Sequence, residues 1–192
     1  VDLFYLSEIE FIQGKAHKTL TDAILIEKFK NLRKDLERLP IARKISDILD
    51  NLIKGQEPDE KIWQLLEETF QKLNHYNLEP KTYNLIYCYF LWNLLSILGY
   101  QPQLENCLIC QKKLIPQKLY FSPQGGGIIC QNCQVDKKGG EEISPEIVKI
   151  LRIIFKKNWL ILSKLKINED YFKDLDSISA LYLNFILEGL KS

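Results

Sequence analysis

The sequence predicts a mainly α-helical protein, a helical bundle that carries a four-cysteine zinc-finger insert and is preceded by strands of a small β domain. Three observations lead to this fold class. Helical periodicity governs most of the chain after residue 30, four of the five cysteines form two close pairs within an aperiodic interval, and residues 1–29 have β character. With 192 residues and 46% hydrophobic composition, the chain can bury a core without disulfides.

Residues 1–29 predict two strands. Residues 7–12 partly alternate polar and apolar side chains, Gly14-Lys15 supplies a turn, and residues 18–26 are rich in β-branched side chains. Two strands alone are marginal in water, so we expect them to belong to a larger sheet. The sequence also begins at Val1 and contains no methionine, which suggests that part of this β domain precedes it.

Three helices are expected before residue 100. A leucine and isoleucine stripe runs from residue 30 to Gly55, with Pro40 either kinking the segment or opening a second helix. A helix begins at Pro58-Asp59-Glu60 and continues to Leu73, because acidic residues suit a helix N-terminus. The helix at 80–98 is apolar nearly all round, which places it at the centre of the bundle.

The remaining helices lie beyond an aperiodic interval at 100–143. Ser144 caps a helix that presents an apolar face as far as Phe155, residues 159–162 are ambiguous between strand and helix, and a last helix covers 170–190. The longest apolar run, 85–98, is too short to cross a bilayer, so no membrane association is expected.

The cysteine pairs predict a structural metal centre. Cys107 and Cys110 form one C-x-x-C pair, and Cys130 and Cys133 form another after nineteen residues. Each pair places two thiolates on one tight turn, and two such turns complete the tetrahedral shell of structural zinc. We expect one Zn²⁺ per chain with a structural role, since no coordination position is left for water.

Other uses of these cysteines remain open. Two disulfides would require an oxidising compartment, and an iron–sulfur cluster would use the same four ligands. A thioredoxin-like redox pair would need a βαβ context that the chain lacks. Cys88 lies within the apolar helix, where it is interpreted as a small buried side chain.

The sequence does not predict an enzyme. Its two histidines, His17 and His75, lie in unrelated segments, and no H/C-x-E motif of a zinc deaminase is present. A catalytic zinc would need an open position, and no segment suggests a catalytic triad.

The net charge of +1 conceals a local polarity. Residues 28–44 contain seven lysines and arginines against two acidic residues, a net charge of +5, whereas residues 57–68 carry −4. Clustered cations neutralise phosphates, although a solvated helix face is an equally good interpretation of any one of them. The candidate phosphate contacts are Lys28, Lys30, Arg33, Lys34, Arg38 and Arg43.

The order of motifs resembles the RecO family of bacterial recombination mediators. The matching segments are Thr19–Ala23, Leu32–Leu39, the run Leu98-Gly99-Tyr100-Gln101-Pro102-Gln103-Leu104 leading into the first cysteine pair, Phe121-Ser122-Pro123 before a glycine cluster and the second pair, and the closing Gly189–Ser192. The run joined to a C-x-x-C pair is the specific element, whereas C-x-x-C pairs alone are not.

The resemblance implies a domain division and a function. Residues 1–29 would be the last strands of a truncated N-terminal OB-fold, and 30–192 a RecO-like helical domain with its zinc finger at 104–140. Such proteins bind single- and double-stranded DNA, anneal strands, associate with RecR and with the C-terminal tail of the single-stranded-DNA-binding protein, and help load RecA in the RecF pathway. The location implied is the bacterial cytoplasm, at the nucleoid.

A second function remains open from the residues. A zinc-stabilised helical module that binds only protein would have the same cysteines and helices without any affinity for DNA. OB-folds hold single strands with basic grooves and stacking aromatic rings. If much of that barrel is missing, DNA binding by residues 1–192 is in question, and Tyr5 and Phe11 serve more simply as packing residues than as stacking platforms.

Overall fold

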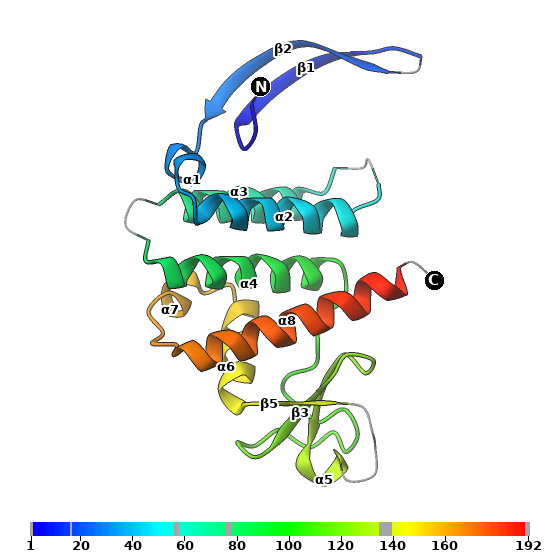
Figure 1. Cartoon of the computed structure of the whole chain (residues 1–192). Helices are drawn as coiled ribbons and strands as arrows, with labels where there is room; N and C mark the ends of the chain where they lie inside the picture. The colour runs from blue at the N-terminus through cyan, green and yellow to red at the C-terminus, as the bar shows by residue number, and fades with distance from the viewer. Residues whose placement is uncertain (1, 16, 56–57, 76–77, 135–139, 191–192) are drawn as a thin grey trace.

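The structure is a computed structural model that describes all residues except 1, 16, 56–57, 76–77, 135–139 and 191–192. Glu57 of the acidic stretch, residues 135–139 of the expected insert and the last two residues of the closing motif therefore lie outside the described residues. About half of the chain is helical, with small antiparallel sheets at either end (Figure 1). The elements in chain order are β1 (Leu6–Gln13), β2 (Lys18–Glu27), α1 (Lys30–Lys34), α2 (Arg38–Leu52), α3 (Glu60–Asn74), α4 (Pro80–Ile97), β3 (Leu119–Ser122), β4 (Gly127–Cys130), α5 (Gln131–Gln134), β5 (Glu141–Ile143), α6 (Pro145–Phe155), α7 (Trp159–Leu162) and α8 (Glu169–Gly189).

The two predicted N-terminal strands are present and form one hairpin. β1 and β2 pair antiparallel, with register irregularities between Leu6 and Ser7 and between Glu10 and Phe11. Figure 1 shows the hairpin in blue, extending above the helices. Every residue from Glu8 to Lys28 that the structure describes is exposed, so this hairpin has no buried face of its own.

Three phenylalanines attach the base of the hairpin to the helical body. Phe4 and Phe29 both pack edge-on against Phe70 of α3, with ring centroids 5.6 and 5.8 Å apart. Phe29 is buried although the strand before it is exposed. The boundary between exposed ribbon and packed body therefore falls at this aromatic cluster.

The first helical stripe divides into α1 and α2 earlier than the sequence indicates. Residues 35–37 are not helical, and Leu36, expected on the apolar stripe, is 88% exposed. The Asp35 carboxylate accepts the backbone N–H groups of Glu37 and Arg38 at 2.8 and 3.2 Å, which satisfies the free donors at the start of α2. Pro40 lies in the first turn of α2, as expected of a proline that opens a helix.

The apolar helix is central, as predicted. α4 contacts α2 and α3 on one side and α6 and α8 on the other, and Figure 1 shows it crossing the middle of the molecule. Tyr89, Phe90 and Trp92 are fully buried. α4 therefore contributes strongly to the hydrophobic stabilisation of the body, since this free energy scales with the apolar area removed from water.

The C-terminal half supplies the lower layer of the body. Ser144 caps α6 by accepting the Ile147 N–H, and α8 matches the predicted last helix within one residue at each end. The ambiguous segment at 159–162 forms a single helical turn, α7. Among the described residues, no helix has the length and apolar character needed to cross a membrane.

The cysteine insert, residues 103–143, forms a compact β unit below α8 (Figure 1). Its sheet has the order β4-β3-β5, with both pairings antiparallel. A Cβ placed on Gly127 would lie 2.6 Å from the Gln103 carbonyl oxygen, so only glycine permits the backbone at Gln103 to lie against β4.

Candidate metal centre and basic surface

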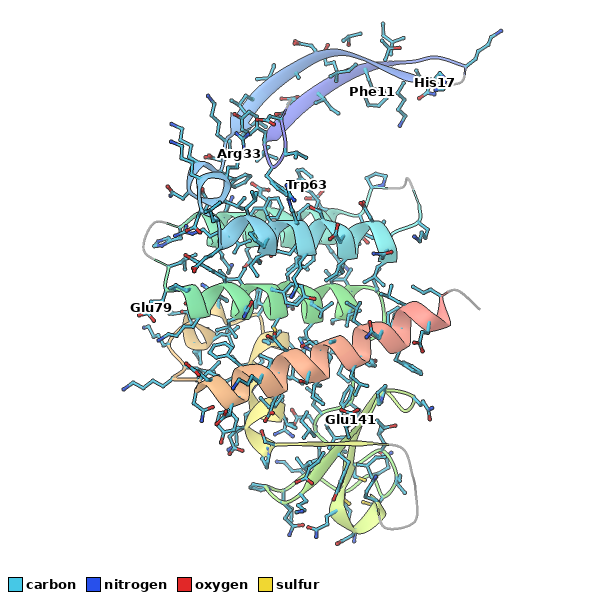
Figure 2. All side chains as sticks on the ribbon, in the orientation of Figure 1. Phe11, His17, Arg33, Trp63, Glu79 and Glu141 are labelled. Atoms are coloured by element: carbon cyan, nitrogen blue, oxygen red, sulfur yellow. The ribbon has the colours of Figure 1, made fainter. Side chains whose placement is uncertain are left out.

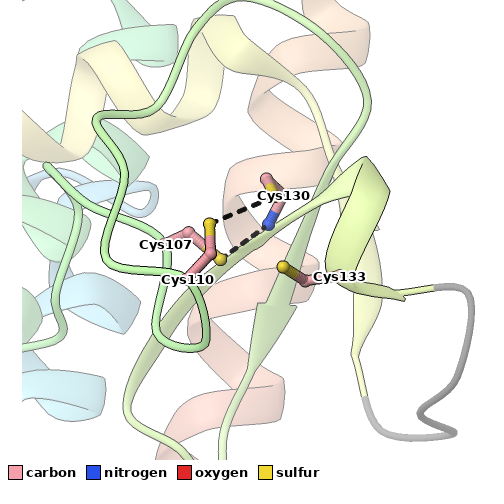
Figure 3. A group of neighbouring side chains, drawn as sticks. All are labelled: Cys107, Cys110, Cys130 and Cys133. Carbon is pink, nitrogen blue, oxygen red and sulfur yellow. Dashed lines mark hydrogen bonds between the residues drawn. The ribbon is translucent and has the colours of Figure 1, made fainter.

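The two cysteine pairs converge on one point. The first pair lies on the loop before β3, while Cys130 ends β4 and Cys133 lies in α5. All four sulfur atoms lie within 4.8 Å of one another, and those of Cys110 and Cys130 are 3.9 Å apart (Figure 3). Four thiolates about 2.3 Å from a tetrahedral metal lie about 3.8 Å from each other, so this spacing fits a closed metal shell.

Backbone hydrogen bonds hold the first pair in a tight turn. The Cys107 N–H donates to the Lys112 carbonyl at 2.9 Å, and the Ile109 N–H donates to the Cys107 sulfur at 3.4 Å. Gln111 adopts a left-handed conformation with φ of 59°, which returns the chain toward the sulfurs. The Leu108 N–H donates to Ile128 of β4, so the first pair is fastened to the strand that carries the second.

The surroundings of Cys107 lower the pKa of its thiol. Burial opposes the thiolate of Cys107, but the N–H groups of Cys130, Cys110 and Ile109 donate to its sulfur and lower its pKa to about 6. The pKa of Cys133 is raised to about 12, first by its hydrogen bond to Cys130. In the metal-free cluster the pKa of Cys107 is therefore lower than that of Cys133, and a bound cation would favour the thiolate at every ligand.

All five cysteines are free, and they divide into four that cluster and one that does not. Cys88 lies in α4, is buried as expected, and contacts Asp176 at 3.6 Å and Ser179 at 3.9 Å. Burial and the nearby Asp176 carboxylate raise its pKa. Cys107, Cys110, Cys130 and Cys133 are thus the group that could hold a metal ion.

An aromatic stack seats the cysteine insert on the helical body. Tyr182 of α8 stacks on Trp92 of α4, with centroids 5.5 Å apart, and meets Phe121 of β3 edge-on at 5.2 Å. The Tyr182 hydroxyl also donates to the Tyr100 carbonyl at 3.0 Å. The three rings come from segments that are far apart in the sequence, and nothing local to any of them shows that they meet.

Of the candidate phosphate contacts, Lys28, Lys30, Arg33 and Lys34 lie near the hairpin base, whereas Arg38 and Arg43 lie in α2. Lys28, Lys30, Lys34 and Arg43 are exposed, and none forms an ion pair among the described residues. Arg33 is half-buried, pairs with Asp2, and lies over the Tyr5 ring at 4.2 Å (Figure 2).

Arg38 serves the fold instead. Its side chain is buried and donates to the Tyr83 hydroxyl at 3.2 Å and to the Leu73 and His75 carbonyls at 3.0 and 2.8 Å. It also pairs with Asp35 at 3.0 Å. Because this side chain is buried and its Nε and Nη1 groups are hydrogen-bonded inside the protein, Arg38 is not exposed for phosphate contact and is not a candidate.

Comparison with known proteins identifies the family of this chain. The family described as "Recombination protein O C terminal" matches residues 33–192, which begin near the end of α1 and include the helical body and the cysteine insert. The chain belongs to the RecO family. RecO relatives named "DNA repair protein RecO" include those of Dehalococcoides mccartyi, 32% identical over 98% of this chain and 72% of the relative, and of Desulforamulus reducens, 29% identical over the same shares. Another, from a Thermoanaerobacter species, is 25% identical over 96% of this chain and 73% of the relative. These names support a role in DNA repair for RecO proteins.

Proposed function

We propose that this RecO family member is a DNA-binding recombination mediator in bacterial DNA repair, acting by binding rather than by catalysis. It would bind single- and double-stranded DNA, anneal complementary strands and help load RecA in the RecF pathway. Its protein partners would be RecR and the C-terminal tail of the single-stranded-DNA-binding protein. The expected location is the bacterial cytoplasm, at the nucleoid.

One observation carries the DNA-binding part of this proposal. Lys28, Lys30 and Lys34 are exposed within seven residues of one another at the hairpin base, and Arg43 is exposed on α2. None has a carboxylate partner among the described residues, so their charges are available to phosphates. Contacts of this kind release counterions and need no particular base sequence, which suits a mediator that acts on any strand.

The hairpin supports the assignment of residues 1–29 to the end of an OB-fold. Cross-strand partners share a face, and the pairs Ile9–Ala23 and Phe11–Leu20 make one face largely apolar. Ile9, Phe11 and Leu20 are all exposed. A sheet face of this kind is normally covered, and further strands of a barrel would cover it.

The cysteine insert supports a structural zinc finger, placed at 104–140 in the sequence. Cys107, Cys110, Cys130 and Cys133 would bind one Zn²⁺ per chain, because four thiolates in a closed tetrahedral shell are typical of structural zinc. The metal would organise a segment with a small core and no disulfide among its cysteines.

Charge reversal at the hairpin base tests the DNA-binding proposal. We expect K30E/K34E to weaken binding of the 192-residue chain to a fluorescein-labelled dT30 at least tenfold in 50 mM salt. The slope of log affinity against log salt should fall by about 1.4, since each lost phosphate contact on a single strand is worth about 0.7. Anisotropy titrations at several salt concentrations measure both.

A matched control separates local from overall charge. K54E/K61E changes the charge by the same amount at the C-terminal end of α2 and the N-terminal end of α3, and both lysines are exposed. Equal effects of the two variants would contradict a local surface. A wild-type chain without measurable affinity for DNA would instead favour the alternative, a zinc-stabilised module that binds only protein.

A further inference from the structure

A groove of about 1050 Å³ opens where α3 ends, α4 begins and the α7–α8 connection passes. Figure 1 shows these segments together with α1 along the left edge of the molecule, and Figure 2 places Glu79 at that edge. Neither the cysteine cluster nor the candidate phosphate contacts of the sequence analysis include a residue of this groove.

The groove carries an excess of positive charge. Its lining includes four lysines, namely Lys72, Lys81, Lys164 and Lys166, and two carboxylates, Glu68 and Glu79. Both carboxylates are already neutralised, because Glu68 pairs with Lys72 and Glu79 with Lys81 at 2.6 Å. Lys164 and Lys166 have no ion pair within the described part of the chain, so their charges face the groove uncompensated.

An aromatic ring lies among these lysines. Trp159 lines the groove, is half-buried, and packs edge-on against Tyr89 with centroids 5.5 Å apart. The Lys72 ammonium lies 5.5 Å from its ring centre. Leu165 and Ile167 add apolar lining. Aromatic rings between cations are the means by which proteins bind single strands, with phosphates on the cations and a base against the ring.

The groove is continuous with the basic surface at α1. A second hollow of about 640 Å³ is lined by Lys34 of α1, by Pro80 and Tyr83 of α4, and by Leu78. Leu78 also lines the larger groove, so the two hollows adjoin at this residue. A basic track, defined here by Lys34, Lys164 and Lys166, therefore runs from α1 across the start of α4 to the α7–α8 connection.

We propose that the basic track binds one single strand of nucleic acid, which continues from the α1 surface into the groove and places a base against Trp159. This inference rests on the proposed DNA-binding function and extends it to residues that had no assigned role. A single strand is favoured over a duplex, because only unpaired bases offer a face to an apolar lining. A nucleic acid strand is favoured over an acidic peptide, because the track continues a surface already proposed to bind the phosphates of DNA.

Charge reversal in the groove tests the track. Against labelled dT30, K164E/K166E should weaken binding by the 192-residue chain at least tenfold and lower the salt slope by about 1.4, whereas K54E/K61E should not. A 30-base-pair duplex should lose less affinity than dT30. Addition of dT30 should quench the fluorescence of a W63F variant, and W63F/W159F should lose most of that quenching while the buried Trp92 remains. Circular dichroism confirms that each variant is folded.

The outcomes separate this inference from the function on which it rests. If the wild type does not bind dT30, both proposals fall. If K30E/K34E weakens binding but K164E/K166E and K164Q/K166Q do not, the α1 surface stands and the track is overturned. If the groove variants leave dT30 binding intact but abolish binding of poly-glutamate, the groove is a site for acidic peptides and the track is likewise overturned.

Discussion

The hairpin and the cysteine insert are both antiparallel β segments attached to the same helical body, and their burial is opposite. In the insert, six of the eight residues of β3 and β4 are buried and the other two are partly buried, with Phe121 and Ile128 fully buried. In the hairpin, every described residue from Glu8 to Lys28 is exposed. Both regions have the β-branched and aromatic side chains that favour strands, so composition does not explain the difference.

The difference lies in what each region contacts. The insert has its sulfur cluster on one side and the Trp92–Tyr182 pair on the other, and the Leu108 N–H joins its loop to β4. The hairpin contacts the body near its base, through the rings of Phe4 and Phe29 and through Arg33, which pairs with Asp2 and lies over Tyr5. Strand pairing by itself is marginal in water, so a small sheet persists where a metal or a packed face is added to it.

Removal of one ligand should have the largest effect. We expect C107S to lower bound zinc from about one to near zero per chain and to remove the hydrogen-exchange protection of β3 and β4. The apparent free energy of zinc binding in small zinc folds is about 10–16 kcal/mol at neutral pH, and loss of a ligand removes much of it. Exchange in the hairpin should not change. Elemental analysis and exchange mass spectrometry measure these effects.

The buried Cys88 supplies the control for that experiment. C88A removes a thiol outside the cluster, so it should keep the metal while losing some stability from the core. Retention of about one zinc by C107S would contradict the four-thiolate centre.

Two phenylalanines offer the most direct comparison of the regions. F121A removes a fully buried ring that contacts Trp92 and Tyr182, and should lower the free energy of unfolding by about 3–5 kcal/mol. F11A removes a strand phenylalanine that is 48% exposed, and should change it by less than about 0.5 kcal/mol. Urea denaturation followed by circular dichroism gives both values. Similar losses in the two variants would mean that the hairpin is packed against other residues in solution.

The smallest effect concerns the joint between the hairpin and the body. Burial opposes the charge of Asp35, but the N–H groups of Glu37 and Arg38 and the Arg38 guanidinium lower its pKa below the ordinary 3.8. Its stabilising contribution is therefore complete above pH 3.8 and disappears as the pH falls through the lower folded value. D35N keeps an oxygen that can accept from the start of α2 but removes the charge paired with Arg38, so it should cost about 1 kcal/mol or less at pH 7. The gap between wild type and variant should close in acid, and a gap independent of pH would contradict this role.

Sequence reasoning was most reliable where a short segment determines its own structure. The capping Ser144, the acidic start of α3 and the apolar length of α4 each depend on neighbours within one or two turns, and the helices lie where they were expected. The convergence of the two cysteine pairs was also predicted, because ligand chemistry restricts the spacing that can close a shell.

Contacts between distant segments were not predictable in this way. Arg38 stands in a basic stretch and was expected to be exposed, yet its partners Leu73, His75 and Tyr83 lie 35 to 45 residues away. The α1–α2 break was expected at Pro40 but lies at residues 35–37, because the Asp35 side chain caps the start of α2. The lysines at 164 and 166 were not singled out, because only the fold brings them beside α3 and α4.

The position of Tyr182 in the chain has a consequence for biosynthesis. A protein emerges from the ribosome N-terminus first, and Tyr182 follows Cys133 by 49 residues. All four thiols are therefore available to a metal before α8 is complete. The insert must retain its own shape while Tyr182, one of the two rings against which it packs, is still untranslated. Metal capture would protect the nascent insert during this interval, and the arrival of α8 would then fasten it to the body.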